Sequence, residues 1–393
     1  MSIEHDKAVL REALDNFFVT RPLGEDHEPI PVARIALTCT LYFKNAHLPE
    51  VQHNVCECVR DFVSLIGEET KFCITADTSR CTLAKKRKLR IMDESMLHKI
   101  QEKGNKPSVR FLVASHDSMD EFNTMPPKFS LMTRLQIGMG DDAKDTIPLD
   151  KKVSYFSAVF APSFFLLDKQ PLTFTDLVLK WCNALRPLSG AAGWGVSQPS
   201  EEWRFLYAES LCAQELIQYP GLDKPLRPLL RDDTQPFEKH IASINWLTIL
   251  CDELVERVGG VESLRSLGKE YPLARYDGGY IIQAGPKPEL GNREYGEIPQ
   301  YYGKVHDLLR PLYPPLEGLD DLVVTVYDFD PHTLELNDHS KEEATRRRRD
   351  FLKTWLNRYS LDVETPPLFR DAGPREDDDE DYDEDYDDDE DEE

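Results

Sequence analysis

The residues with the most evident chemical potential are the carboxylates near the end of the chain. Sixteen of the eighteen residues from Glu376 to Glu393 are Asp or Glu. Like charges a few ångströms apart repel one another, so this run is expected to stay extended and solvated, as a disordered solubilising tail does. The same charges would also attract a cationic surface. The residues predicted to contact such a partner are Asp377, Asp378, Asp379, Tyr382, Tyr386 and Asp387.

The rest of the chain offers little that is typical of an enzyme. The sequence contains no GxSxG nucleophile elbow, no GxxxxGK[ST] phosphate loop and no HExxH zinc helix. Asp328, Asp330 and His332 lie at a predicted strand end and offer ligands for a hard metal, although solvated carboxylates in a turn explain the pattern more simply. Catalytic partners that are distant in sequence can still meet in space. We nevertheless expect a protein that is not an enzyme and needs no cofactor or metal.

Composition indicates an acidic protein with a sizeable core. The chain has 393 residues, 40% of them hydrophobic, and a formal net charge of −25. Such a chain has no overall attraction for nucleic acid or an anionic membrane, so neither is expected as a direct partner. The eight cysteines form no CxxC pair, and most lie in apolar stretches. No secretory leader and no membrane-spanning stretch are evident, so we expect a soluble cytoplasmic protein.

The elements that must position these groups can be predicted from the spacing of apolar residues. Residues 34–43 alternate as a strand does, residues 48–67 show helical spacing, and residues 71–76 are typical of a second strand. The same order of strand, helix and strand recurs over residues 152–161, 171–190 and 193–197. The two units are interpreted as pseudo-repeats from the order of their elements alone.

These elements predict an α+β fold with a mixed, largely antiparallel, twisted sheet and flanking helices. A single domain is expected over residues 1–370, with subunits 30–145 and 150–330 and a C-terminal helix over 340–359. Residues 371–393 would form the disordered acidic tail.

Several local patterns lead to more specific predictions. Residues 243–260 are expected to form a helix that buries Trp246, Leu247, Leu250 and Leu254, and Trp194 is expected in a packed turn. Asp277, Gly278 and Gly279 predict the turn of a hairpin. In the last helix, a core stripe is predicted for Phe351, Trp355 and Tyr359, with Arg346–Arg349 on the surface.

The stretch from Ser243 to Leu312 resembles a known family. The resemblance is carried by INWLTILCDELVERVGGVESL, YDGGYIIQAGPKPELGN and IPQYYGKVHDLLRPL, with VSYFSAVFAP and GAAGWGVS upstream. Together these segments are similar to the TsiV-like immunity proteins of type VI secretion systems, over roughly residues 30–325. The acidic tail and the Arg-rich last helix do not belong to the family pattern.

The resemblance implies a non-enzymatic antidote, or antitoxin, that binds its cognate type VI effector toxin in the cytoplasm and blocks it by stoichiometric occlusion. Some toxins of such families are nucleases. The family-signature residues are expected to serve the fold and not the toxin contact: Trp194, Asn245, Trp246, Gly278 and Gly279. Two other hypotheses stay open, namely an acidic chaperone for basic proteins and an enzyme that acts on the toxin's product. A homodimer is also left open.

With a nuclease as partner, the tail has a second interpretation. A flexible polyanion could occupy a cationic groove as a phosphate backbone would, with Tyr382 and Tyr386 stacking where bases normally sit. Long-range attraction would speed the encounter, and salt would suppress it. Alternatively, the tail folds back on Lys85–Arg90 or Arg346–Arg349 and screens these basic clusters until the toxin displaces it.

Overall fold

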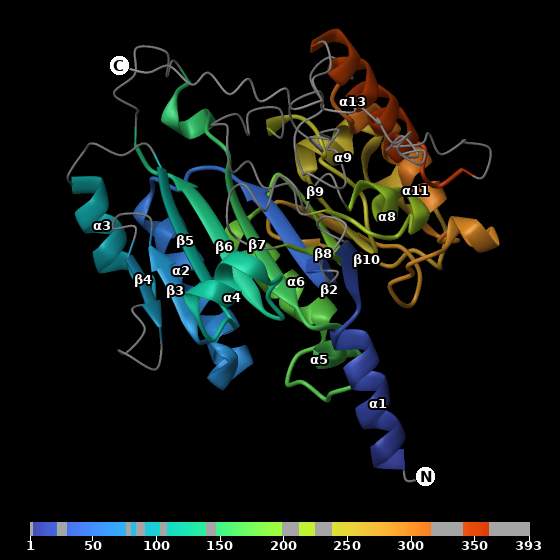
Figure 1. Ribbon diagram of the computed structural model, residues 1–393. Helices are drawn as coiled ribbons and strands as arrows, with labels where there is room; N and C mark the ends of the chain where they lie inside the picture. The colour runs from blue at the N-terminus through green and yellow to red at the C-terminus, as the bar shows by residue number, and fades with distance from the viewer. Residues whose placement is uncertain are drawn as a thin grey trace, which may run out of the picture.

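The computed structural model describes residues 3–21, 30–75, 80–83, 91–102, 108–138, 147–198, 212–224, 238–315 and 341–360. They form an α+β fold around one eleven-stranded sheet, and every pairing between its strands is antiparallel. The predicted fold class is therefore confirmed. Figure 1 shows the strands side by side, with helices packed around them.

The strands follow the order β10-β11-β9-β8-β2-β7-β6-β5-β3-β4, and β1 pairs with β2. Their bounds are β1 (Phe18–Arg21), β2 (Ile30–Phe43), β3 (Phe72–Thr75), β4 (Arg80–Leu83), β5 (Ser108–Ala114), β6 (Ser130–Gln136), β7 (Ser154–Phe160), β8 (Ser189–Ser197), β9 (Leu247–Cys251), β10 (Leu273–Tyr276) and β11 (Gly279–Gln283). The long strand β2 is central, because Leu37 lies opposite Phe160 of β7 on one side and opposite Trp194 of β8 on the other.

Two helices cover one face of the sheet. They are α2 (Pro49–Ile66) and α6 (Phe174–Leu185), which also pack against each other. Trp181 of α6 lies against Phe156 and Phe160 of β7, with ring centroids 4.9 and 6.2 Å apart. This aromatic contact fixes α6 over the centre of the sheet.

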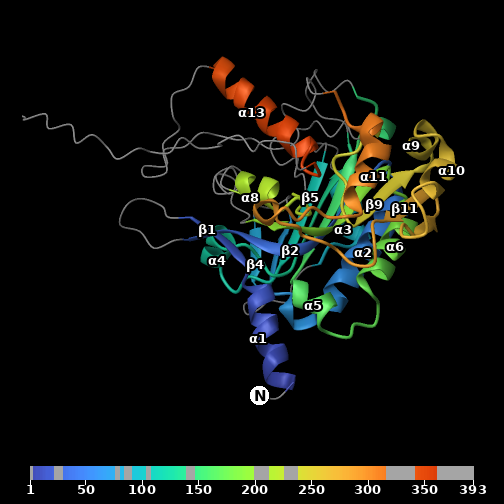
Figure 2. The same ribbon diagram turned by 90° about the vertical axis from the view of Figure 1, so that its right-hand side faces the viewer.

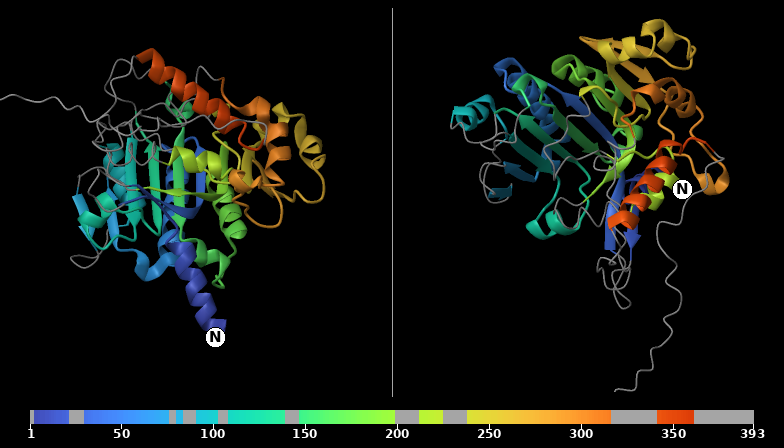
Figure 3. Two further views of the ribbon diagram at one scale, coloured as in Figure 1. Left: turned by 45° about the vertical axis from the view of Figure 1, so that its right-hand side comes forward. Right: turned by 90° about the horizontal axis from the view of Figure 1, so that it is seen from above.

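The opposite face is covered by α8 (Ala213–Gln218) and α13 (Lys341–Leu356). The right-hand view of Figure 3 shows these two helices on the other side of the sheet from α2 and α6. Phe351 and Trp355 are buried and Tyr359 is partly buried, which confirms the predicted core stripe. Arg346 and Arg349 are exposed, as predicted for that part of the Arg cluster.

The remaining elements lie around this core. They are α1 (Ile3–Asp15), α3 (Glu94–Glu102), α4 (Met119–Thr124), α5 (Pro162–Leu166), α9 (Asp252–Arg257), α10 (Gly260–Arg265), α11 (Tyr302–Leu309) and the short 3-10 helices η1 (Gly67–Glu69), η2 (Leu149–Lys151), η4 (Arg293–Tyr295) and η5 (Arg310–Leu312). In Figure 1, α1 extends away from the sheet at the bottom of the view. None of the helices within the described ranges combines the length and the apolar character that crossing a membrane requires.

Both predicted strand-helix-strand units are present, as β2-α2-β3 and β7-α6-β8. All four strands belong to the same sheet, in which β7 and β8 flank β2 while three strands separate β2 from β3. The interpretation of the units as pseudo-repeats, and the division into subunits, stay predictions.

Two local predictions are wrong. The segment predicted as one helix over 243–260 contains strand β9, and helix α9 begins only after that strand. Trp194 lies within strand β8 and not in a turn. In both cases the apolar pattern was compatible with helix, strand or turn, and pairing with neighbouring strands decided the conformation.

Candidate functional site

Several residues singled out in the sequence lie outside the described part of the chain. They are the tail residues Asp377, Asp378, Asp379, Tyr382, Tyr386 and Asp387, the metal-ligand candidates Asp328, Asp330 and His332, and the basic run Lys85–Arg90. Their predicted roles therefore stay predictions.

Three of the family-signature residues meet at one place in the interior. The side-chain Nδ2 of Asn245 donates to the carbonyl oxygen of Trp194 at 2.7 Å, and its Oδ1 accepts from the backbone N–H of Trp246 at 2.7 Å. The indole of Trp246 donates to the carbonyl of Gly285 at 3.0 Å. Gly193 lets β8 approach Asn245 this closely, because a Cβ atom there would collide with the side-chain amide of Asn245. These contacts support the interpretation that this group holds the fold.

Gly278 and Gly279 lie elsewhere, in the hairpin of β10 and β11. Gly278 has a φ of 106°, which glycine adopts far more easily than other residues, and its carbonyl accepts from the N–H of Asp252 at 2.9 Å. Gly279 is the first residue of β11 and pairs with Cys251 of β9. The predicted hairpin is therefore present, and it is joined to the start of α9.

A buried polar cluster that the sequence did not reveal lies beneath α13. The guanidinium of Arg358 is fully buried and donates to the carbonyls of Pro220, Trp355 and Ile244 at 3.1, 3.0 and 3.5 Å. It also lies over the rings of Trp355 and Tyr359, at 4.0 and 4.5 Å from their centroids. The only hint in the sequence is that Arg358 lies within the apolar stripe, directly before Tyr359.

The carboxylate of Asp223 completes this cluster. It accepts from the hydroxyl of Ser243 and from the N–H of Lys224. Burial raises the pKa of Asp223 to about 6, and the charge of Arg358 opposes this rise. The cluster connects three segments that are distant in sequence, so its main physical effect is to fix their relative positions.

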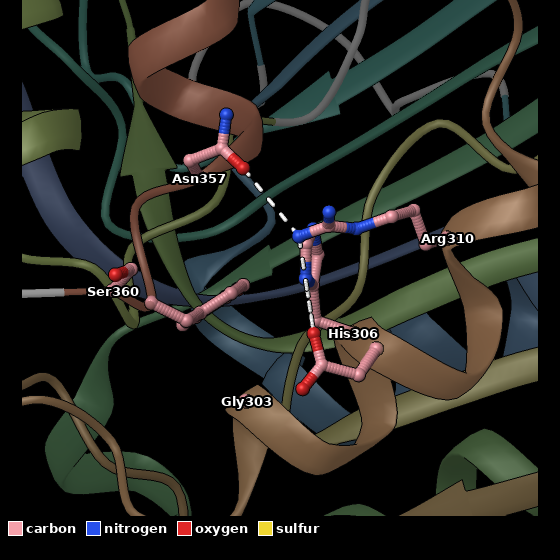
Figure 4. A pocket seen from close by; sticks show the side chains of 7 residues that line it. Gly303, His306, Arg310, Asn357 and Ser360 are labelled. Carbon is pink, nitrogen blue, oxygen red and sulfur yellow. Dashed lines mark hydrogen bonds and ion pairs between the residues drawn. The ribbon is translucent and has the colours of Figure 1, made fainter. Parts of the chain in front are cut away.

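A cavity of about 330 Å³ lies beside the cluster, between α11 and the end of α13. Its lining residues are Gly303, His306, Asp307, Arg310, Asn357, Tyr359 and Ser360. Figure 4 shows Arg310 reaching toward Asn357 across the opening, and the guanidinium donates to the Asn357 side-chain oxygen at 3.5 Å. The charge of Arg310 is thus already shared with Asn357 and with Asp307 at 3.9 Å.

Two titratable groups that line this cavity have a shifted pKa, namely the imidazole of His306 and the hydroxyl of Tyr359, whose pKa burial raises. Burial, together with the charges of Arg358 and Arg310, lowers the pKa of His306 to about 4. The imidazole is therefore neutral near pH 7 and packs between the rings of Tyr313 and Tyr359, with centroids 5.6 and 5.5 Å away. This arrangement fits a packed side chain that holds α11 against α13.

One exposed group resembles a metal site. His53, Glu57 and Glu94 place their ligand atoms within 4.8 Å of one another. Arg60, however, forms ion pairs with Glu57 at 2.8 Å and with Glu94 at 2.7 Å. A guanidinium therefore already neutralises both carboxylates, which disfavours a metal at this place.

Comparison with solved structures finds the same architecture in a known protein. The Pseudomonas aeruginosa T6SS protein PA0821 matches with a TM-score of 0.64 and 20% sequence identity, over 92% of this chain and 91% of that chain. At this level of identity the likeness shows a shared fold. No curated protein matches the sequence.

A family model described as type VI immunity for VRR-NUC matches residues 54–347, which is well over half of the chain. The protein is therefore a type VI immunity protein, whose partner is a cognate effector. It belongs to the TsiV family, which confirms the resemblance seen in the sequence.

Proposed function

We propose that this protein binds a cognate VRR-NUC nuclease effector in the cytoplasm and neutralises it by stoichiometric occlusion, without turnover and without a cofactor. The observation that carries the proposal is the family match over residues 54–347, whose description specifies immunity to VRR-NUC. The charge of the chain supports it, since a net charge of −25 complements the cationic surface with which a nuclease holds phosphates.

The interior supports a binding function over a catalytic one. The buried polar side chains described above bind neighbouring backbone groups: Asn245 binds Trp194, and Arg358 binds three carbonyls. His306 lies among aromatic rings. Within the described residues, these groups are engaged in joining elements of the fold, which leaves the surface as the part that meets a partner.

The acidic tail has a separate part in this proposal. The folded body would provide most of the affinity, while Asp377, Asp378, Asp379 and Asp387 attract the cationic face of the effector. Tyr382 and Tyr386 would stack in the groove that normally receives bases. The tail would thus raise the association rate and mask the nucleic-acid site.

The test is a titration of the effector's nuclease domain with the full-length protein. We expect a one-to-one complex by size-exclusion chromatography with light scattering, and complete loss of DNA cleavage at one molar equivalent. An unrelated basic nuclease, as a control, should stay active at the same ratio.

Other outcomes distinguish the alternative hypotheses. Protection at far below one equivalent would indicate an enzyme. Equal binding of many basic proteins by a peptide of residues 376–393 would indicate an acidic chaperone. Absence of a complex with the cognate nuclease would contradict the proposal itself.

A further inference from the structure

The surface of the described residues carries one conspicuous aromatic side chain. Tyr295, at the end of η4, is 74% exposed, more than any other large hydrophobic side chain among the described residues. Phe17, between α1 and β1, is 42% exposed. An exposed aromatic side chain leaves a large apolar surface in contact with water. Two such side chains in one patch therefore indicate a surface that contacts a partner.

These aromatic residues belong to one patch built from three segments. The rings of Phe17 and Tyr219 meet edge to face with centroids 6.4 Å apart. Gln218, beside Tyr219 at the end of α8, donates to the carboxylate of Glu294 at 3.4 Å. Figure 2 shows α8 next to β1, as these contacts require. We define the Tyr295 patch as Phe17, Glu215, Tyr219, Glu294 and Tyr295.

Carboxylates surround the aromatic rings of the Tyr295 patch. Burial raises the pKa of the Tyr219 hydroxyl, and the neighbouring Glu215, Glu294 and Tyr295 raise it further. Glu297, two residues beyond Tyr295, is exposed as well. The nearest cation in this turn, Arg293, donates its guanidinium hydrogens to the carbonyls of Arg358 and Ser360 at 3.0 and 2.8 Å. The patch therefore presents aromatic rings in a negative surrounding.

The turn that carries Tyr295 is held in place from both ends. Asn292 and Glu297 exchange backbone hydrogen bonds of 2.7 and 2.8 Å, and the Asn292 side chain caps η4 by accepting from the N–H of Glu294 at 3.0 Å. Arg293 fastens the same turn to the end of α13. A side chain on such a turn loses little conformational entropy when it binds a partner.

The last described residue of the chain lies beside the turn that carries Tyr295. The described chain ends at Ser360, whose carbonyl accepts a hydrogen bond from Arg293, two residues before Tyr295. The 16 carboxylates of the tail follow in the same chain.

We infer that the Tyr295 patch is the surface on which the folded body docks the effector, with Tyr295 as the central anchor and the cationic DNA-binding face of the nuclease as the occupant. The inference rests on the proposed function and adds the contact surface to it. Lys and Arg side chains that normally hold phosphates would pack against the rings of Tyr295 and Tyr219 and pair with Glu294. Tyrosine and arginine dominate such contacts in protein interfaces.

The experiment measures binding of full-length variants to a catalytically inactive effector nuclease domain by surface plasmon resonance, at 50 and 500 mM salt. Tyr295→Ala should weaken binding about 30-fold, the loss expected for a central anchor, while Tyr295→Phe should stay within about threefold. Glu294→Lys should slow association about tenfold at 50 mM salt and much less at 500 mM salt.

The matched controls are Leu48→Ala, on a side chain 43% exposed at the start of α2, and Glu68→Lys on the exposed η1. Both should bind as the unmodified protein does. If the unmodified protein binds tightly while Tyr295→Ala and Glu294→Lys bind equally well, the inference is overturned and the proposed function stands. If the unmodified protein does not bind, both are overturned.

Discussion

Asn245 shows how a single side chain connects distant strands of this protein. Its amide bridges the carbonyl of Trp194 and the N–H of Trp246, and the hydroxyl of Tyr302 lies 3.5 Å from its Oδ1. Replacement by Ala leaves these buried groups without partners, so we predict that Asn245→Ala lowers the free energy of unfolding by about 2–3 kcal/mol. Urea unfolding followed by tryptophan fluorescence measures this change. The exposed Asn16→Ala should change stability by less than about 0.5 kcal/mol, and a similar small effect at Asn245 would contradict the assigned role.

Asp223 gives a prediction that depends on pH. Its pKa is about 6 in the folded protein and 3.8 in the reference state, so the folded protein holds this proton more tightly. The resulting stabilisation is complete below about pH 3.8 and is lost as the pH rises through 6. Asp223→Asn cannot gain this stabilisation. The free energy of unfolding of Asp223→Asn should therefore be lower than that of the unmodified protein at pH 4, and this difference should be about 2 kcal/mol larger at pH 4 than at pH 7.

The comparison needs dilute protein, since the calculated isoelectric point is 4.8. His306 acts in the opposite direction, because its lowered pKa removes stability as the pH falls from 6.5 toward 4. The two groups oppose each other in the unmodified protein, so the difference between variant and unmodified protein is the informative quantity. A deficit that stays the same at both pH values would contradict the buried ionisation of Asp223.

At the scale of single elements, the β10-β11 hairpin depends on its turn. Gly278 has a φ of 106°, where a Cβ atom is strained by about 1–2 kcal/mol. We predict that Gly278→Ala lowers the free energy of unfolding by this amount. Asp277→Ala, which removes only an exposed ion pair with Arg186, should change it by less than about 1 kcal/mol. Thermal unfolding of the two variants side by side tests the difference.

Some of the helices and strands can be predicted from the sequence, and others cannot. Strand β2 and helices α2 and α6 were predicted well, because each has a clear period of apolar residues and recognisable ends. The sequence wrongly predicts a helix in place of strand β9, because Leu247, Leu250 and Leu254 fit the buried face of a helix as well as they fit a strand followed by a helix. The deciding interaction is the ladder to β8 and β11, whose residues lie tens of positions away or more.

The candidate sites were harder to predict for the same reason. The family-signature residues could be identified from motifs, yet only the fold shows that Asn245 touches Trp194 while Gly278 lies in a separate hairpin. The Arg358 cluster and the Tyr295 patch each combine segments from three regions of the chain. A local sequence pattern cannot predict such contacts, since the residues become neighbours only when the chain has folded.

At the scale of the whole molecule, charge should control the rate at which the protein meets its partner. We predict that deletion of residues 376–393 lowers the association rate with the effector about tenfold at 50 mM salt, with little change at 500 mM salt. The dissociation rate should change much less, because the folded body provides most of the affinity. Stopped-flow measurements at the two salt concentrations test this.

A control with the tail residues replaced by an equally long Gly-Ser segment separates charge from length. If it restores the association rate, attraction by the carboxylates is the wrong explanation. A full-length variant in which only Tyr382 and Tyr386 are changed to Ser tests how much stacking contributes to masking the nucleic-acid site of the effector. The measured quantity is the nuclease activity that remains in the complex.

The position of β2 in the sheet also has a consequence for synthesis. This strand is complete at Phe43, yet two of the strands that pair with it, β7 and β8, end at Phe160 and Ser197, and Arg358 closes the packing near the end of the described chain. Ribosomes add about 5–20 residues per second, so roughly 20–70 s pass before residue 358 has been made. Throughout this interval the nascent chain cannot complete its packing. A cell under attack is therefore protected by molecules finished earlier, and a standing reserve of the antidote matters more than a rapid burst of new translation.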